Sequence, residues 1–276
     1  MVSYVFVRRV KNVVAGIILA VALFFFLFPI YWMVSTAFKV KAEFWSYPPI
    51  YIPTVLTLNN FLEGFELGGL ESLKHSLIVA SCNTVVCVIL GSLAAYAIAR
   101  YRIGGDNLAF WILSNRMLPP IAFVIPLFLW FRTLKLLDTY PALILAYCTF
   151  NLPFATWLLI GFFEEVPREL EEAALVDGCS RLSAFWRVAL PVAAPGLVAT
   201  ALLCFIFAWN EFMFALFLMR EIRTLPVLIP CLIGGHEILW GAISAMGLLS
   251  IIPPVLIAVL LQKYVIRGMT FGAIKG

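Results

Sequence analysis

One acidic residue stands out because it lies within a long apolar segment. Glu211 follows Trp209 and Asn210 in the sequence FAWNEF. A charged side chain costs roughly 2.5–3.5 kcal/mol near the centre of a bilayer, so Glu211 is expected to face water or a partner. Carboxylate and amide groups form hydrogen bonds with hydroxyls, and an indole offers a flat apolar face to a sugar ring. These three residues are therefore candidates for a solute path. The alternative is that Glu211 pairs with Arg220 or Arg116 and only orients its helix.

Groups that could carry catalysis or hold a metal are few. The chain has two histidines, His75 and His236, and its six cysteines form no CxxC pair. It contains no G-x-x-x-x-G-K-[ST] phosphate loop, and no glycine is followed directly by lysine. We therefore expect neither a catalytic site nor a metal or cofactor bound by this chain. An intramembrane enzyme would need a paired catalytic constellation, and the sequence offers none.

The longest polar interruption of the sequence covers residues 164–194. Residues 167–177 are predicted to form a short helix, which Gly178 ends in a left-handed conformation. Its first turn carries acids that suit the positive end of a helix dipole: Glu169, Glu171 and Glu172. Ser180 can cap a second helix that continues as far as Pro191. The pattern predicts an elbow of helix, glycine turn and helix. Without further information, it could also be an ordinary amphipathic hairpin on a membrane surface.

The composition is that of an integral membrane protein. Of 276 residues, 63% are hydrophobic and 12% are charged, and the mean hydropathy is +1.03. The net charge of +4 is too small to indicate a nucleic-acid partner. Six segments are long and apolar enough to cross a bilayer as helices. The predicted fold is therefore all-α and polytopic, a single transmembrane domain over residues 1–276 in contact with lipid, with spans at about 13–36, 75–99, 108–131, 141–163, 195–219 and 241–266.

Two of these spans carry features that predict how they pack. The span 108–131 contains Arg116 and three prolines, so we expect it to be broken or kinked. For Arg116, snorkelling or a structural ion pair is favoured over solute binding. In the second span, Gly91, Ala95 and Ala99 recur every four residues, and this small face predicts close helix packing within the bundle.

The positive charges predict the orientation. Six spans place both termini on one side of the membrane. If the termini, the turn before residue 108 and the elbow are cytoplasmic, eleven Lys or Arg lie inside and seven outside, with Arg116 in neither group. The positive-inside rule favours this orientation. Residues 39–74 and 220–240 are then external loops, the first made of turns, and residues 267–276 form a cytoplasmic tail.

The elbow resembles a known family motif. The sequence Glu172-Ala173-Ala174 is followed by three residues, Gly178, nine residues and then Val188-Ala189-Leu190-Pro191. This spacing is similar to the EAA loop of bacterial ABC-importer permeases, in which isoleucine stands at the position of Val188. The resemblance implies that the elbow is a coupling helix that docks into a groove on a separate ATPase. The residues implied in coupling are Glu172, Ala173, Ala174, Asp177, Gly178, Leu190 and Pro191.

The resemblance extends from the third span to the C-terminus. The segments RMLPP, NLPFATWLL, FAWNEF and RGMTFGAIKG look like the second permease of maltose-type carbohydrate importers, whereas the N-terminal third matches only in hydropathy. The resemblance implies a heterodimer with a homologous permease, two ATPases that hold ATP and Mg, and an extracytoplasmic solute-binding protein, all at a bacterial inner membrane. It also implies that tail residues Lys275 and Gly276 contact the ATPases.

The sequence is therefore interpreted as the non-catalytic permease subunit of an ATP-driven importer for a sugar or sugar-like polyol. The alternative is an ion-coupled secondary transporter acting alone. Such a transporter needs an intramembrane acid on a proton path, for which Glu211 is the only candidate, and it usually shows an internal repeat, which this sequence lacks.

Overall fold

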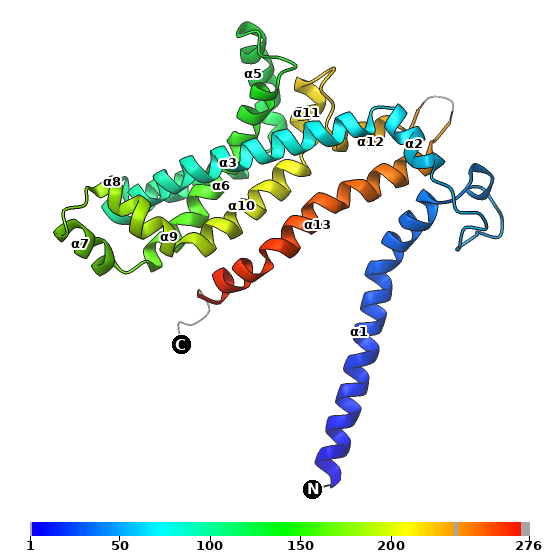
Figure 1. The fold of residues 1–276 in the computed structure, drawn as a ribbon, viewed down its shortest axis with the longest axis horizontal. Coiled ribbons are helices and arrows are strands. Elements are labelled where there is room, and N and C mark those ends of the chain that lie inside the picture. The colour runs from blue at the N-terminus through cyan, green and yellow to red at the C-terminus, as the bar shows by residue number, and fades with distance from the viewer. Residues whose placement is uncertain (1, 235–236, 272–276) are drawn as a thin grey trace. The chain divides into compact units, whose positions relative to one another are not determined.

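The computed structural model describes residues 2–234 and 237–271, and its regular elements in these ranges are helices. The one β feature among them is an isolated antiparallel bridge between Ile233 and Ile238. The elements, shown in Figure 1, are α1 (Val2–Ala37), η1 (Lys41–Glu43), α2 (Asn59–Glu66), α3 (Gly69–Tyr101), α4 (Gly105–Ser114), η2 (Asn115–Met117), α5 (Pro120–Thr133), α6 (Tyr140–Glu165), α7 (Arg168–Val176), α8 (Arg181–Ala184), η3 (Phe185–Ala189), α9 (Leu190–Val192), α10 (Ala194–Trp209), α11 (Met213–Leu218), α12 (Leu225–Cys231) and α13 (Trp240–Phe271).

The predicted all-α membrane fold is confirmed. Helices α1, α3, α6 and α13 are each long and apolar enough to cross a membrane, and they contain four of the six predicted spans. Two bent helix pairs raise the number to as many as six within the described residues. Four of the predicted spans therefore lie within single helices. One bent pair covers the predicted span 108–131, whereas the other covers residues 181–209 and overlaps the predicted span 195–219 only in part.

The predicted break in the span 108–131 is present. The helical stretch at 107–117 and helix α5 meet at an angle of 87°. Leu118 and Pro119 between them have extended backbone, with ψ of 133° and 134°. The cause is the Pro119-Pro120 pair, because a proline disfavours helical geometry in the residue before it.

The predicted span over residues 195–219 is not one continuous helix. Helix α10 ends at Trp209, and α11 begins only at Met213. Before α10, the helical segment Arg181–Val192 meets it at 77°. The break after Trp209 coincides with Glu211, whose carboxylate accepts hydrogen bonds from the first turn of α11. A local side-chain cap therefore competes with continued helix at this point.

Two predicted loops and the predicted tail contain more helix than expected. Residues 39–74 include η1, α2 and the first turns of α3, and residues 220–240 include α12. The side chain of Asn60 donates hydrogen bonds to the carbonyls of Ala37 (2.9 Å) and Lys39 (2.7 Å), so the start of α2 is tied to the end of α1. The tail is likewise helical as far as Phe271. Helices α2 and α12, with eight and seven residues, are shorter than the window of about 11–18 residues over which an apolar period can be recognised in a sequence.

The chain divides into two compact units. The first comprises Met1–Gly69 and Ile229–Leu249, and the second comprises Leu70–Leu228 and Ser250–Gly276. The first unit has a small core in which Met246 is fully buried with Ala37 and Ala242. None of the apolar window of α1 is buried within the chain. The apolar surface of α1 therefore needs lipid or another protein around it.

The second unit is built on α3, α6 and α10, which run alongside one another (Figure 1). The buried amide of Asn151 on α6 donates to Oδ1 of Asn83 on α3 (2.7 Å) and to the carbonyl of Cys204 on α10 (3.0 Å). At the predicted small face, a Cβ on Gly91 would lie only 3.0 Å from the Cβ of Ala155. The prediction that this face packs within the bundle is confirmed.

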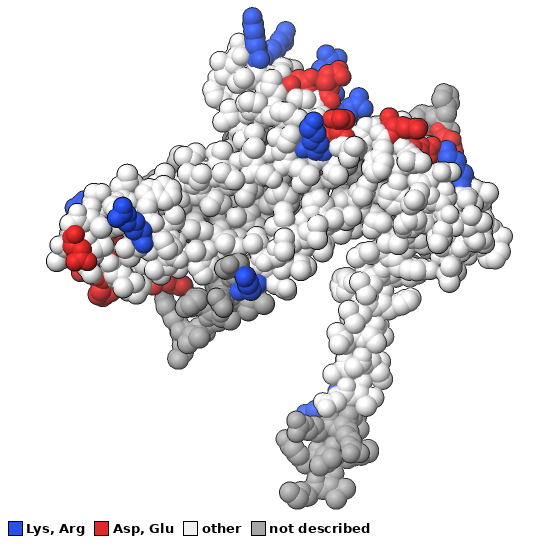
Figure 2. Space-filling view, viewed as in Figure 1, with Lys and Arg blue, Asp and Glu red and all other residues white. Residues whose placement is uncertain are grey.

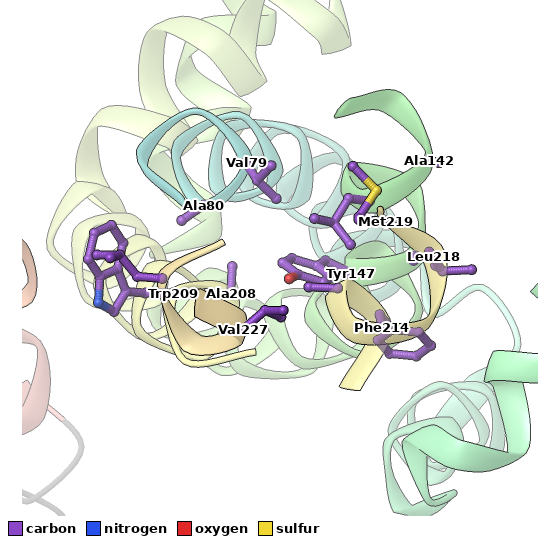
Figure 3. Packing of buried hydrophobic residues seen from close by; sticks show 14 of the residues in the cluster. Val79, Ala80, Ala142, Tyr147, Ala208, Trp209, Phe214, Leu218, Met219 and Val227 are labelled. Atoms are coloured by element: carbon purple, nitrogen blue, oxygen red, sulfur yellow. The ribbon is translucent and has the colours of Figure 1, made fainter. Parts of the chain in front are cut away.

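The largest core lies between these helices and α5, α11 and α12. Figure 3 shows Tyr147 at its centre, with Val79 and Ala80 on one side and Phe214 on the other. On the surface, charged side chains of the second unit gather over α7 and α8 and again around α5 and α11 (Figure 2). On the face that Figure 2 shows, the surface between these two ends is largely uncharged, as a bilayer favours.

Candidate functional site

The first half of the elbow has the predicted local structure. Helix α7 starts after Pro167 and ends at Val176, one residue inside each predicted limit. Gly178 has a φ of +87°, and Cys179 N–H donates to the carbonyl of Ala174 (3.0 Å). Glycine adopts this left-handed geometry without the steric cost of a Cβ. The turn therefore reverses the chain directly after the helix.

The second half of the elbow is joined to the membrane bundle. Ser180 caps α8 by accepting a hydrogen bond from the N–H of Ser183 (3.3 Å), as predicted. The chain stays helical through the π-helical turn η3 and α9 to Val192. Phe185 and Ala189 of η3 are buried in a cluster with Phe163 of α6 and residues of α3. This half is therefore held by packing rather than by its polar surface.

A buried ion pair, which the sequence analysis missed, anchors α7 to α3. Glu171 accepts a hydrogen bond from Nε of Arg100 (2.7 Å) through one oxygen and from the hydroxyl of Tyr96 (2.6 Å) through the other. A second guanidinium nitrogen of Arg100 donates to the carbonyl of Val166 (2.7 Å). The two charged side chains are only 7% and 9% exposed. From the sequence, Glu171 is expected only to favour the positive end of the helix dipole. The available signal was Arg100, which lies at the end of a predicted span. A charge buried there needs an acidic partner nearby.

The outward face of the elbow combines small, acidic and apolar residues. Glu172, Ala173, Asp177 and Gly178 are exposed, and Ala174 is half-buried. Apolar side chains lie exposed around them, with Val176 88%, Leu182 62% and Leu170 46% exposed. The structure thus brings five of the seven predicted coupling residues together at the tip. Leu190 and Pro191 lie farther along, in α9 beside the bundle.

At the predicted solute path, Glu211 caps a helix. Its two carboxylate oxygens accept hydrogen bonds from the N–H groups of Phe214 (2.8 Å) and Ala215 (3.3 Å), in the first turn of α11. The ion pairs within the described residues are Lys41–Glu63, Glu71–His75 and Arg100–Glu171. The alternative that Glu211 pairs with Arg220 or Arg116 is therefore wrong.

Trp209 and Asn210 differ in what they can offer a solute. The indole of Trp209 is only 3% exposed, stacks on Phe205 at 5.6 Å and donates to the carbonyl of Ser250 (3.1 Å). In Figure 3 it lies at the edge of the core, and burial leaves neither face of the indole free to stack on a sugar ring. Asn210 is exposed, and its amide donates to the carbonyl of Ile206 (2.8 Å). The carbonyl oxygen of that amide is left for other partners.

Arg116 is held by aromatic rings. Its guanidinium lies 4.2 Å from the ring centres of both Phe154 and Phe207. No carboxylate among the described side chains pairs with it. Of the two expected alternatives, snorkelling and an ion pair, the ion pair is therefore wrong, and cation–π contacts stabilise the charge.

Three residues singled out in the sequence, His236, Lys275 and Gly276, lie outside the described residues. Their roles stay predictions.

Comparison with known proteins decides the family. Residues 87–271 match the model of a family described as the binding-protein-dependent transport system inner membrane component. This chain belongs to that family. The match covers the central helices, the elbow and the Asn210 break.

Relatives match over nearly the full length. The chain is 38% identical over 276 residues to a trehalose/maltose transport system permease protein of Thermococcus litoralis, covering 98% of both chains. It is 37% identical to a diacetylchitobiose uptake system permease protein of Streptomyces coelicolor, over 97% of this chain and 98% of the relative. A sulfoquinovosyl glycerol transport system permease protein of Agrobacterium fabrum is also 37% identical, over 91% and 89%.

A solved structure supports the same conclusion. A chain of a bacterial ABC transporter involved in import of the acidic polysaccharide alginate superposes with a TM-score of 0.77 and 25% identity, covering 93% of this chain and 97% of that one. The protein is accordingly a multi-pass inner-membrane permease subunit of an ABC importer.

Proposed function

We propose that this permease imports a sugar or sugar-like polyol. The observation that carries the proposal is the 38% identity to a trehalose/maltose permease across 98% of both chains. Further relatives are named for trehalose, diacetylchitobiose and sulfoquinovosyl glycerol, all of which contain a sugar. A solute class shared by several relatives is better supported than any one of their substrates.

We propose that the elbow transmits ATP hydrolysis to the membrane helices. ATP and Mg would be held by separate ATPase subunits, into whose grooves the tip around Ala173 and Gly178 inserts. The support is geometric, because the tip is exposed and small whereas α7 is tied to α3 through Glu171 and Arg100. A rigidly anchored helix can pass a displacement at its tip to the bundle. Leu190 and Pro191 would set the angle at which the elbow leaves the bundle.

The remaining partners are a second homologous permease and an extracytoplasmic solute-binding protein. The family description, which names binding-protein-dependent transport, supports the latter. The unburied apolar window of α1 supports a neighbouring protein or lipid around that helix. In this arrangement, both termini are cytoplasmic and the tail with Lys275 and Gly276 reaches the ATPases.

We assign the solute path to the break between α10 and α11. Asn210 would contact the solute, and Glu211 would hold the break open by capping α11. Trp209 supports the break from within the core and does not stack on the solute. The secondary-transporter alternative is disfavoured, because the chain matches the binding-protein-dependent transport family and permease proteins of that kind over nearly its full length.

Uptake by the reconstituted complex tests the function. The chain is purified with the subunits that copurify, placed in proteoliposomes with its binding protein, and supplied with radiolabelled maltose or trehalose. We expect uptake to require ATP on the side of the membrane where the elbow lies. Uptake should continue when ionophores collapse the ion gradients. Uptake that ionophores abolish, or that proceeds without an ATPase subunit, would identify a secondary transporter instead. A binding protein that captures only amino acids or inorganic ions would contradict the solute class.

A further inference from the structure

A cationic cavity of about 370 Å³ lies at the elbow end of the second unit. It is formed by the last turn of α3, the first turns of α4, the end of α6 and the start of α7. Its charged lining comprises the three guanidiniums of Arg100, Arg102 and Arg168 and the single carboxylate of Glu164. The excess of positive charge predicts an anionic ligand.

Two of the three guanidiniums are available to that ligand. Arg100 is occupied by Glu171 and by the carbonyl of Val166. Arg102 and Arg168 are exposed, and neither forms an ion pair with any side chain that the structure describes. Planar guanidinium groups match the oxygens of a phosphate by forming paired hydrogen bonds. The cavity therefore presents two free groups suited to phosphate.

The backbone around the cavity adds to this preference. Gly105 lines the cavity at the N-terminus of α4, a ten-residue helix whose preceding residue, Gly104, supplies no side-chain cap. The N–H of Gly105 donates to the carbonyl of Arg102 (3.1 Å), so what this end of α4 contributes is the positive end of its helix dipole, which favours an anion. Arg102 itself has a φ of +50°, which is uncommon for a residue other than glycine, asparagine or aspartate. This strained turn places an arginine where the chain leaves α3.

Apolar walls indicate where the anion comes from. Ile98, Ala109 and Ile160 line the same cavity. The first and last of these lie near the ends of the membrane-spanning helices α3 and α6, where apolar surface gives way to charge. Apolar walls contribute nothing to the binding of a free phosphate ion. A phospholipid, in contrast, has both a phosphate and an apolar part that can contact them. Basic pockets between spanning helices are typical sites for anionic lipid headgroups.

We propose that this cavity binds the phosphate of an anionic phospholipid headgroup through Arg102 and Arg168. The proposal is independent of which solute is carried. Because Arg168 begins α7 and Arg100 holds Glu171, the bound headgroup lies against the anchor of the elbow. The lipid then stabilises the orientation of α7 relative to α3.

Native mass spectrometry of the full-length chain with its copurifying subunits tests the proposal. Dioleoylphosphatidylglycerol and dioleoylphosphatidylcholine are offered at equal concentration to the parent protein and to the double variant Arg102→Asn/Arg168→Gln. Asparagine is chosen because it tolerates positive φ, so the turn is kept while the charge is removed. Arg187→Gln serves as the control, since Arg187 is an exposed arginine of the elbow outside the cavity lining.

The parent and the control are expected to retain phosphatidylglycerol in preference to phosphatidylcholine. Retention by the double variant should fall roughly tenfold, as for the loss of charge-assisted hydrogen bonds. Equal retention of the two lipids, or full retention by the double variant, would overturn the proposal. Displacement of the lipid by millimolar inorganic phosphate would assign the cavity to free phosphate. Retention of the lipid only after the ATPase has been dissociated from the complex would assign the arginines to that protein interface.

Discussion

Gly178 is the residue on which the direction of the elbow depends most. A Cβ at this position would meet no atom within 4 Å, so any cost of substitution comes from its φ of +87° rather than from crowding. Gly178→Val should destabilise the turn by about 1–2 kcal/mol and reduce transport, while Gly178→Asn, which tolerates this conformation, should retain most of it. Uptake and ATPase copurification are measured for both. Equal loss in the two variants would show that the position needs a small side chain for docking rather than a positive φ.

Asn210 and Glu211 are expected to respond differently to substitution. Glu211→Ala removes the cap of α11 and should cost about 0.5–2 kcal/mol of stability, with weaker complex assembly. Glu211→Gln keeps one oxygen acceptor and should be milder. Asn210→Ala should lower uptake with assembly preserved, because its side chain is exposed and bonds only its own helix. Thermal stability, assembly and uptake are compared. Normal uptake by Asn210→Ala would remove this residue from the solute path.

The connection between α3 and α7 predicts a strong effect from one buried pair. Glu171→Gln leaves Arg100 buried with a neutral partner and should destabilise the anchor by up to about 3–5 kcal/mol. Adding Arg100→Gln should recover part of that loss, because two neutral amides replace an uncompensated charge. Glu169→Gln, an exposed acid of the same helix turn, is the control and should be nearly silent. Thermal unfolding of the purified complex measures all four proteins. A silent Glu171→Gln would mean that packing of η3 alone holds the elbow.

At the opposite end of the second unit, Asp138 ties the α5–α6 turn to the segment after α11. Its carboxylate accepts hydrogen bonds from the N–H groups of Arg220 (3.0 Å), Glu221 (3.1 Å) and Ile222 (3.2 Å). Burial by itself would raise the pKa of Asp138, but these donors outweigh it and hold the pKa below its ordinary value. A depressed pKa stabilises the folded state above the ordinary value, and this contribution is lost as the pH falls through the folded value.

The Asp138→Asn variant tests this pH dependence. The parent should be more stable than the variant at neutral pH, and the difference should shrink as the pH falls below about 4, the ordinary range of an aspartate. The midpoint of thermal unfolding is recorded for both proteins across that interval, with Lys135→Gln as a control on the same turn. A difference that stays constant with pH would show that the carboxylate does not act through its charge.

Across the full chain, the C-terminal segment is predicted to communicate with the ATPases. Deleting residues 271–276 removes only the last residue of α13 and the segment outside the described part. We expect changed ATP hydrolysis with normal assembly, since the spanning helices are left intact. Hydrolysis and copurification are measured together. Unchanged hydrolysis and transport would indicate a frayed terminus.

The membrane spans and the elbow were predictable because their signals are local. Apolar length predicted the spans that lie within α3 and α6, the Pro119-Pro120 pair predicted the break after η2, and Gly178 predicted the turn after α7. Each depends on the backbone preferences or hydropathy of neighbouring residues, which the sequence displays directly.

Side-chain partners were not predictable, because they depend on residues far apart along the chain. Glu171 meets Arg100 and Tyr96 across 71 and 75 positions, and no local pattern distinguishes it from the exposed acids beside it. Glu211 was expected to face a solute path or to pair with an arginine. Instead, backbone N–H groups three and four residues away satisfy it, since the helix breaks where its carboxylate caps α11. The sequence suggests that the indole of Trp209 could stack on a sugar ring. In the structure Trp209 is buried against Phe205, because helix packing decides which face of α10 turns inward.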